Sequence, residues 1–172
     1  MILLKKIEIG VPILKNPWEI ILSSPEDKRN SDYFLLDTGS VLNLLPRISS
    51  LFHRLDKRKF NLAIPEITIK QVVEHLVRSF WKRKKRREKT HGVEEGMRNF
   101  IRFLDDERIL KVSNPEEVPD KHRKQYKKFR EDEILAFLLY EGKFKGIVTE
   151  DGKFKKKLSK NKVVIGYQHL LE

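Results

Sequence analysis

The chain has 172 residues, enough for one domain with a sizeable core and a small appendage, and 36% of them are charged. Its 37 Lys and Arg exceed its 25 Asp and Glu, and the net charge of +12 favours an anionic partner, either nucleic acid or an anionic membrane surface. The absence of cysteine excludes disulfides and thiolate metal sites, and no apolar run is long enough to span a membrane.

The first 32 residues are expected to form an extension that is separate from the domain after them. Residues 2–4 and 20–22 are apolar enough for two short strands, with Gly10, Pro12 and Pro17 between them. Residues 24–30 are polar and indicate a linker. The N-terminus lacks the layout of a signal peptide, so we expect a cytoplasmic protein.

Strands and helices are expected to alternate from Tyr33 onwards. Short runs that are apolar throughout are typical of parallel strands buried on both faces, whereas apolar residues at helical spacing indicate the helices between them. Residues 33–172 therefore predict an α/β domain with a three-layer Rossmann-like architecture, a mainly parallel five-stranded sheet and helices on both faces. The expected strands are 33–36, 61–64, 108–112, 146–149 and 163–165. The expected helices are a stretch that follows residues 37–40 and runs through 55 with a break at Pro46, then 65 to beyond 80, 94–104, 120–140 and 154–158, followed by a final helical turn.

Three aspartates fall where an open parallel sheet places its ligand sites. Asp37 directly follows the first strand of the domain, Asp151 lies just beyond the fourth, and Asp132 lies in the helix before the fourth. We expect their side chains to meet at the carboxyl edge of the sheet. Clustered carboxylates attract Mg²⁺ or Mn²⁺, which can activate a water and stabilise the leaving oxygen of a phosphodiester. A basic protein with one acidic spot therefore favours metal-dependent nuclease chemistry.

The chain resembles the PIN-domain family of nucleases at four short segments. They are residues 35–40 (LLDTGS), 64–67 (IPEI), 131–136 (EDEILA) and 147–154 (IVTEDGKF). The resemblance covers about residues 33–170. It implies a PIN fold and a single-strand endonuclease, usually acting on RNA, whose Mg²⁺ or Mn²⁺ is held by three or four acids. By the same resemblance Asp37, Asp132 and Asp151 would be metal ligands, and Thr38 or Ser40 would orient Asp37.

One position departs from the family pattern. The family usually places a Glu early in the helix after the second strand, where this chain has Gln71. We predict that Glu74, one turn later on nearly the same face, supplies the fourth catalytic acid, with Glu66 at the helix start as the second candidate. Glu150 is expected to support the site. Glu131 and Glu133 are interpreted as surface charges.

A basic helical protrusion, about residues 78–100, is predicted to bind phosphates. Residues 82–89 carry seven positive charges in eight positions and follow Phe80 and Trp81, of which Phe80 is expected in the core. Each phosphate contact should add salt-dependent affinity, and an aromatic ring could stack on a base. A second basic cluster begins at Lys153. The predicted nucleic-acid-binding residues are Arg78, Lys82, Arg83, Lys84, Lys85, Arg86, Arg87 and Lys153.

The working hypothesis is a metal-dependent endoribonuclease with Mg²⁺ or Mn²⁺ as its cofactor and RNA as its partner. Two alternatives are a DNA-specific or structure-specific nuclease of the same fold, and a non-catalytic RNA-binding module that lacks the fourth acid. A homodimer stays open, as does an inhibitory protein partner if the chain is a toxin. Zinc and membrane binding are not expected, because the histidines are dispersed and the basic helix lacks a matching apolar face.

Overall fold

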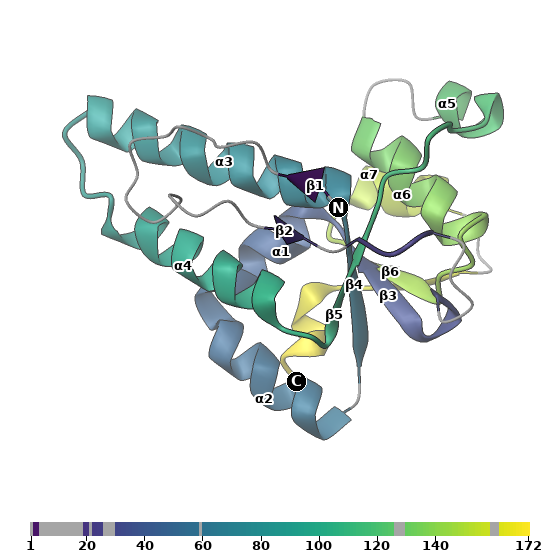
Figure 1. The fold of residues 1–172 in the computed structure, drawn as a ribbon, viewed down its shortest axis with the longest axis horizontal. Coiled ribbons are helices and arrows are strands. Elements are labelled where there is room, and N and C mark those ends of the chain that lie inside the picture. The colour runs from purple at the N-terminus through teal and green to yellow at the C-terminus, as the bar shows by residue number, and fades with distance from the viewer. Residues whose placement is uncertain are drawn as a thin grey trace.

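A parallel sheet runs through the centre of the protein (Figure 1). The computed structural model describes residues 2–3, 19–20, 22–25, 30–58, 60–125, 130–158 and 162–172. The sheet has five strands in the order β5-β4-β3-β6-β7, and every neighbouring pair is parallel. This architecture confirms the predicted α/β class. The strands are β3 (Tyr33–Leu36), β4 (Asn61–Pro65), β5 (Ile109–Val112), β6 (Gly146–Val148) and β7 (Val163–Ile165).

The strand order places a topological switch point at the middle of the sheet. From β3 the chain moves outward through β4 to β5, and it then returns to the other side of β3 to form β6 and β7. The carboxyl ends of β3 and β6 are therefore neighbours, with Leu36 paired to Val148. Open α/β sheets bind their ligands beyond this point, so residues after these two strands are placed for function.

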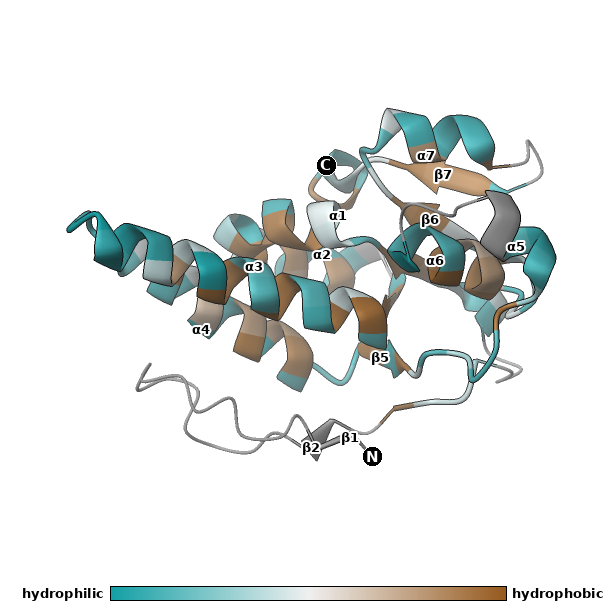
Figure 2. Cartoon of the chain, turned by 90° about the horizontal axis from the view of Figure 1, so that it is seen from above, coloured by the Kyte–Doolittle hydropathy of each residue, from teal (hydrophilic) through white to brown (hydrophobic). Residues whose placement is uncertain are grey.

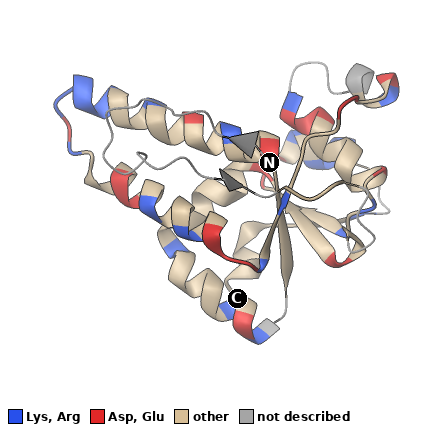
Figure 3. Ribbon diagram, in the orientation of Figure 1, with Lys and Arg blue, Asp and Glu red and all other residues tan. Residues whose placement is uncertain are grey.

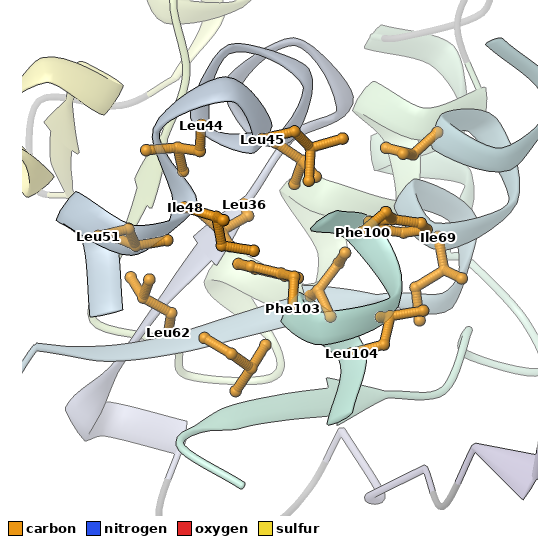
Figure 4. Close-up of a cluster of buried hydrophobic side chains, with 14 of the residues drawn as sticks. Leu36, Leu44, Leu45, Ile48, Leu51, Leu62, Ile69, Phe100, Phe103 and Leu104 are labelled. Carbon is orange, nitrogen blue, oxygen red and sulfur yellow. The ribbon is translucent and has the colours of Figure 1, made fainter. Parts of the chain in front are cut away.

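Helices cover both faces of the sheet, as the pattern predicted. Alternate strand residues point to opposite faces, so Leu36 and Leu62 join one buried cluster and Leu35 and Ile147 join the other. Figure 4 shows Leu36 and Leu62 facing residues from the helices of the first face, with Phe103 near the centre. The first face carries α1 (Thr38–Leu44), η3 (Leu45–Arg47), α2 (Ile48–Arg58), α3 (Glu66–Lys85), α4 (His91–Asp105) and η4 (Tyr167–Leu170), and the second carries α6 (Arg130–Tyr140) and α7 (Gly152–Lys157), with α5 (Asp120–Gln125) against α6.

Several element boundaries differ from the sequence expectation. The break at Pro46 is confirmed and takes the form of the short helix η3. The helix expected over 120–140 is instead assigned as α5 and α6, with residues 126–129 outside the described part. Pro65 ends β4 and precedes α3 rather than lying in its first turn. Despite these differences, Asp37 and Asp151 still follow strands β3 and β6, and Asp132 still lies in the helix before β6.

Part of the N-terminal extension attaches to the domain. β1 (Ile2–Leu3) and β2 (Glu19–Ile20) pair in an antiparallel ladder, whereas Leu4 and Ile21 lie outside the described residues. Ser23 bridges to Val112 on the edge strand β5: its backbone N–H donates to the Lys111 carbonyl at 2.7 Å. Asn30, in η2 (Asn30–Asp32), is buried and donates its side-chain N–H to the Gly142 carbonyl at 2.9 Å. Ser23, directly before the expected linker, and Asn30, at its end, thus each bind a different part of the domain.

The helices α3 and α4 extend beyond the sheet as an arm (Figure 1). They pack on each other through the buried faces that contain Leu76 and Phe80 of α3 and Met97 and Phe100 of α4. The tip of the arm is hydrophilic (Figure 2) and carries a concentration of Lys and Arg (Figure 3). The basic protrusion predicted from the sequence is therefore a two-helix arm. No helix among the described residues is long and apolar enough to cross a membrane.

Candidate active site

Asp37 lies at the switch point, directly between β3 and α1. Its side chain is buried, and its Oδ1 accepts a hydrogen bond from the Ser40 backbone N–H at 2.7 Å, which makes Asp37 the N-cap of α1. The Asp37 N–H and the Ser40 hydroxyl both donate to the Val148 carbonyl, at 3.3 and 3.0 Å. These contacts fix Asp37 against the end of β6. Capping uses one carboxylate oxygen and leaves the other without a hydrogen bond to the described part of the chain.

Asp151 occupies the equivalent position after β6. Its Oδ1 accepts from the N–H groups of Lys153 and Phe154 at 2.8 and 3.0 Å, so it caps α7. Its own N–H donates to the hydroxyl of Thr149, a fully buried residue at the end of the strand. Asp151 is exposed to solvent. Because β3 and β6 are adjacent and parallel, Asp37 and Asp151 lie at the same edge of the sheet.

Asp132 is the acid whose electrostatics connect the others. It lies in the first turn of α6 and is half-buried. Its pKa is raised from 3.8 to about 6 by burial, by repulsion from Asp151 and Glu131 and by a smaller repulsion from Asp37, while Lys157 opposes the shift. Asp37 and Asp151 are therefore both near enough to Asp132 to act on its pKa. We refer to these three residues and Glu131 as the acid cluster.

Glu131 was predicted to be a surface charge, and the structure shows that this interpretation was wrong. Its Oε1 accepts hydrogen bonds from the Thr38 N–H at 2.9 Å, the Thr38 hydroxyl at 2.6 Å and the Thr68 hydroxyl at 3.1 Å. Burial raises the pKa of Glu131, although these hydrogen bonds act in the opposite direction, and Asp37 raises it further. Glu131 therefore links the first turns of α1, α3 and α6.

Position 71, where the family pattern places an acid, does face this region. The Gln71 side-chain carbonyl lies 3.1 Å from the Thr38 hydroxyl, which is closer still to Glu131. A hydroxyl has one proton to donate, and the shorter contact to a carboxylate is the stronger. The fourth carboxylate of the acid cluster thus comes from Glu131 on α6, while α3 contributes an amide.

Neither glutamate predicted on α3 reaches the acid cluster. Glu74 is exposed, and its side chain makes no hydrogen bond or ion pair with the described residues. Glu66 accepts from the Asn114 N–H at 3.1 Å and pairs with Lys70 at 2.8 Å, so its carboxylate fastens α3 to the loop after β5. The structure therefore assigns Glu66 a local structural role.

Of the two residues expected to orient Asp37, Ser40 does so through its backbone N–H. Thr38 orients Glu131 instead of Asp37. Glu150 accepts from the Tyr167 N–H at 3.1 Å and lies 3.6 Å from the Lys155 ammonium, so it holds the C-terminal turn against α7.

The donor set of the acid cluster fits a hard divalent cation. Among the described residues, no three Asp, Glu or His side chains are already arranged as ligands of one metal ion. Mg²⁺ usually binds proteins through one or two carboxylates and keeps several waters, so it does not require such an arrangement. All four side chains offer oxygen, and the repulsion that adds to burial in raising the pKa of Asp132 is one that a bound cation would relieve. Asp151 is exposed and Asp132 half-buried, so the cluster is open to solvent.

The predicted nucleic-acid-binding residues lie at the tip of the arm and beside the cluster. Residues 82–87 are all exposed, as is Lys153 at the start of α7. Phe80 is buried, as expected, whereas Trp81 is 41% exposed, with the Lys84 ammonium 4.8 Å from its ring centroid. The aromatic pair is thus divided between the core and the surface.

Comparison with known proteins supports the α/β fold and gives no information on the chemistry of the site. No protein-family model matches the chain, and no curated protein matches it. A solved structure, the crystal structure of PAE2754 from Pyrobaculum aerophilum, is similar with a TM-score of 0.58 at 19% sequence identity. The similarity covers 82% of this chain and 94% of that one. At this identity the likeness shows a shared α/β fold, and a fold alone does not define a function.

Proposed function

We propose that the protein is a PIN-type endonuclease that cleaves single-stranded RNA with Mg²⁺ or Mn²⁺. One arrangement carries the proposal: Asp37, Glu131, Asp132 and Asp151 gather at the switch point, where burial and then the neighbouring acids raise the pKa of Asp132 to about 6. Such repulsion is typical of functional sites rather than of solvated surface acids. The net charge of +12 supports a polyanionic substrate for the same site.

The residues have separate roles in this proposal. Asp37, Asp132 and Asp151 would hold the cation, which when bound lowers the pKa of a coordinated water and neutralises charge on the phosphodiester. Ser40 keeps Asp37 in place, and Thr38 and Thr68 keep Glu131 beside it. Glu131 would orient waters of the site or its cation, in place of the acid that the family pattern puts at position 71.

Metal-dependent cleavage is the direct test of this function. The purified protein should cleave a labelled single-stranded RNA in Mn²⁺ and lose that activity in EDTA. Asp37→Asn should reduce the cleavage to background while the protein stays folded, because Asn caps a helix as well as Asp and keeps the acceptor for the Ser40 N–H. A role in capping alone predicts unchanged activity.

The matched control is Glu74→Gln, which removes an exposed acid from α3 outside the cluster. It should keep cleavage within about threefold of the wild type, because a solvated charge contributes little. Purifying all variants in parallel separates the activity from contaminating ribonucleases. Cleavage that persists in EDTA, or in Asp37→Asn, would contradict the proposed function, and loss in Glu74→Gln would move the fourth acid from Glu131 to Glu74.

A second candidate is an RNA-binding module without catalysis, and Gln71 is the observation that favours it. An amide faces the Thr38 hydroxyl at the position where the family pattern has an acid. This alternative predicts tight, salt-sensitive RNA binding with no turnover in Mg²⁺ or Mn²⁺. Running matched RNA and DNA strands in the cleavage assay distinguishes it from a nuclease and also tests a DNA-specific activity.

A further inference from the structure

One face of α3 runs from the acid cluster to the tip of the arm. A helix turns once in 3.6 residues, so Arg78, Lys82 and Lys85 project within about 40° of Gln71 around the helix axis. Gln71 lies beside the cluster through its contact with Thr38. Leu76 and Phe80, two of the buried residues of α3, lie on the other side of the helix, and the exposed acid Glu74 lies at the margin of this face, about 60° from Gln71. We call Gln71, Arg78, Lys82 and Lys85 the α3 stripe.

The cations of the α3 stripe have no side-chain partner among the described residues, unlike four of their basic neighbours. Arg78, Lys82 and Lys85 are exposed, and their side chains make no hydrogen bond, ion pair or ring contact within the described part of the chain. Four basic residues off the stripe are engaged, whereas the side chains of Arg87 and Lys89 at the tip make no such contact with the described residues. Lys70 pairs with Glu66, Arg83 donates to the Lys89 carbonyl, Lys84 lies over Trp81, and Arg86 lies 3.8 Å from Glu88.

We propose that the α3 stripe binds the sugar-phosphate backbone of a single-stranded RNA and leads it from the acid cluster to the tip of the arm. The proposal rests on the proposed nuclease function for its direction and substrate. The rise of 1.5 Å per helical residue puts Lys85 about 21 Å from Gln71, which equals roughly six nucleotides of a stacked strand. Three unpaired cations on one line suit a repeating anion, and Trp81 alone is too small an apolar face for a membrane surface.

The stripe is tested by RNA binding in EDTA, where no metal-dependent cleavage occurs. The triple variant Arg78→Gln, Lys82→Gln, Lys85→Gln keeps good helix-forming residues on α3 and should fold like the wild type by circular dichroism. Each lost contact to a single strand should flatten the slope of log affinity against log salt by about 0.7. The variant should therefore lose about 2 units of slope and on the order of 100-fold in affinity for a labelled 12-nucleotide RNA at 0.1 M salt.

The matched control removes the same charge from exposed positions on α2 and α4 with Lys57→Gln, Arg98→Gln and Arg102→Gln. It should keep the wild-type slope, because diffuse attraction falls off with salt whereas direct contacts release counterions. RNA length gives a second readout. Affinity should increase between 4 and 8 nucleotides in the wild type, and this gain should disappear in the stripe variant.

The outcomes separate this proposal from the nuclease function. Equal salt slopes in the stripe variant and the control would overturn the stripe, even if both proteins cleave RNA in Mn²⁺. A stripe variant that loses both the salt slope and the dependence on RNA length supports RNA binding along the α3 stripe. If the wild-type protein binds RNA through the α3 stripe but does not cleave it, the stripe is supported and the proposed nuclease activity is contradicted.

Discussion

Replacing Asp132 with Asn is expected to stabilise the cation-free protein while reducing Mn²⁺-dependent cleavage on the order of 1000-fold. The stabilisation follows from the pKa of Asp132, which burial and the repulsion of Asp151, Glu131 and Asp37 raise from 3.8 to about 6. The loss of cleavage follows because a ligand of the cation would be neutralised. A cation contributes several kcal/mol to charge stabilisation in such reactions, and about 4 kcal/mol corresponds to 1000-fold in rate.

The pH dependence fixes the sign of the stability change. A carboxyl group whose pKa is higher in the folded state holds its proton more tightly there, so stability falls as pH rises from about 4 to about 6. Above pH 6 the penalty is fully present. A shift of roughly two pKa units corresponds to about 3 kcal/mol, which screening by solvent and the lost favourable charge at the start of α6 reduce to about 1 kcal/mol.

Urea unfolding in EDTA measures this effect. Asp132→Asn should be about 1 kcal/mol more stable than the wild type at pH 7.5, and the two proteins should converge near pH 4. Glu74→Gln, an exposed acid outside the cluster, should follow the wild-type profile throughout. Equal stability of Asp132→Asn and the wild type at pH 7.5 would show that Asp132 is not repelled by its neighbours.

Two substitutions of Glu131, to Ala and to Gln, should distinguish its effect on stability from its effect on activity. Glu131→Ala removes the acceptor for the Thr38 N–H and for the hydroxyls of Thr38 and Thr68, and should cost about 2–4 kcal/mol of unfolding free energy. Glu131→Gln keeps an acceptor oxygen in the same place and removes a buried charge. We therefore expect its stability to lie within about 1 kcal/mol of the wild type.

Cleavage assays on the same pair show whether the charge of Glu131 serves the site. Glu131→Gln should lose about 100-fold in kcat in Mn²⁺ because the cluster has one negative charge fewer facing the cation. A merely structural Glu131 predicts full activity in Glu131→Gln and loss only in the unstable Glu131→Ala. Full activity in Glu131→Gln, with normal folding, would return Glu131 to a structural role.

The sheet and two of the acids follow from local patterns in the sequence. Strands that are apolar throughout predict a parallel sheet covered on both faces, and Asp37 and Asp151 stand out because each follows such a strand. The arm was visible as a basic run attached to a helix. To recognise the α3 stripe within that run, one needs the helical angles of α3 and also the side-chain contacts of Arg83, Lys84 and Arg86.

Glu131 could not be recognised in the same way. In the sequence it is one of three consecutive acids, residues 131–133, and such a run is usually solvated. Its burial depends on Thr38 and Thr68, which lie 93 and 63 positions away along the chain. The available signal was that both threonines lie in the first turns of the helices that follow β3 and β4, at the same edge of the sheet. The pairing of Ser23 with the edge strand β5 could not be predicted, because it uses backbone groups and does not depend on the type of side chain.

The acid cluster is tested most directly as a cation site by calorimetric titration with Mn²⁺ at pH 7.5. The wild type and Glu74→Gln should bind Mn²⁺ with the same affinity, and Asp37→Asn and Asp132→Asn should each weaken it at least about tenfold. Equal Mn²⁺ affinity in all four proteins, or no binding by the wild type, would contradict a cation site formed by Asp37, Asp132 and Asp151.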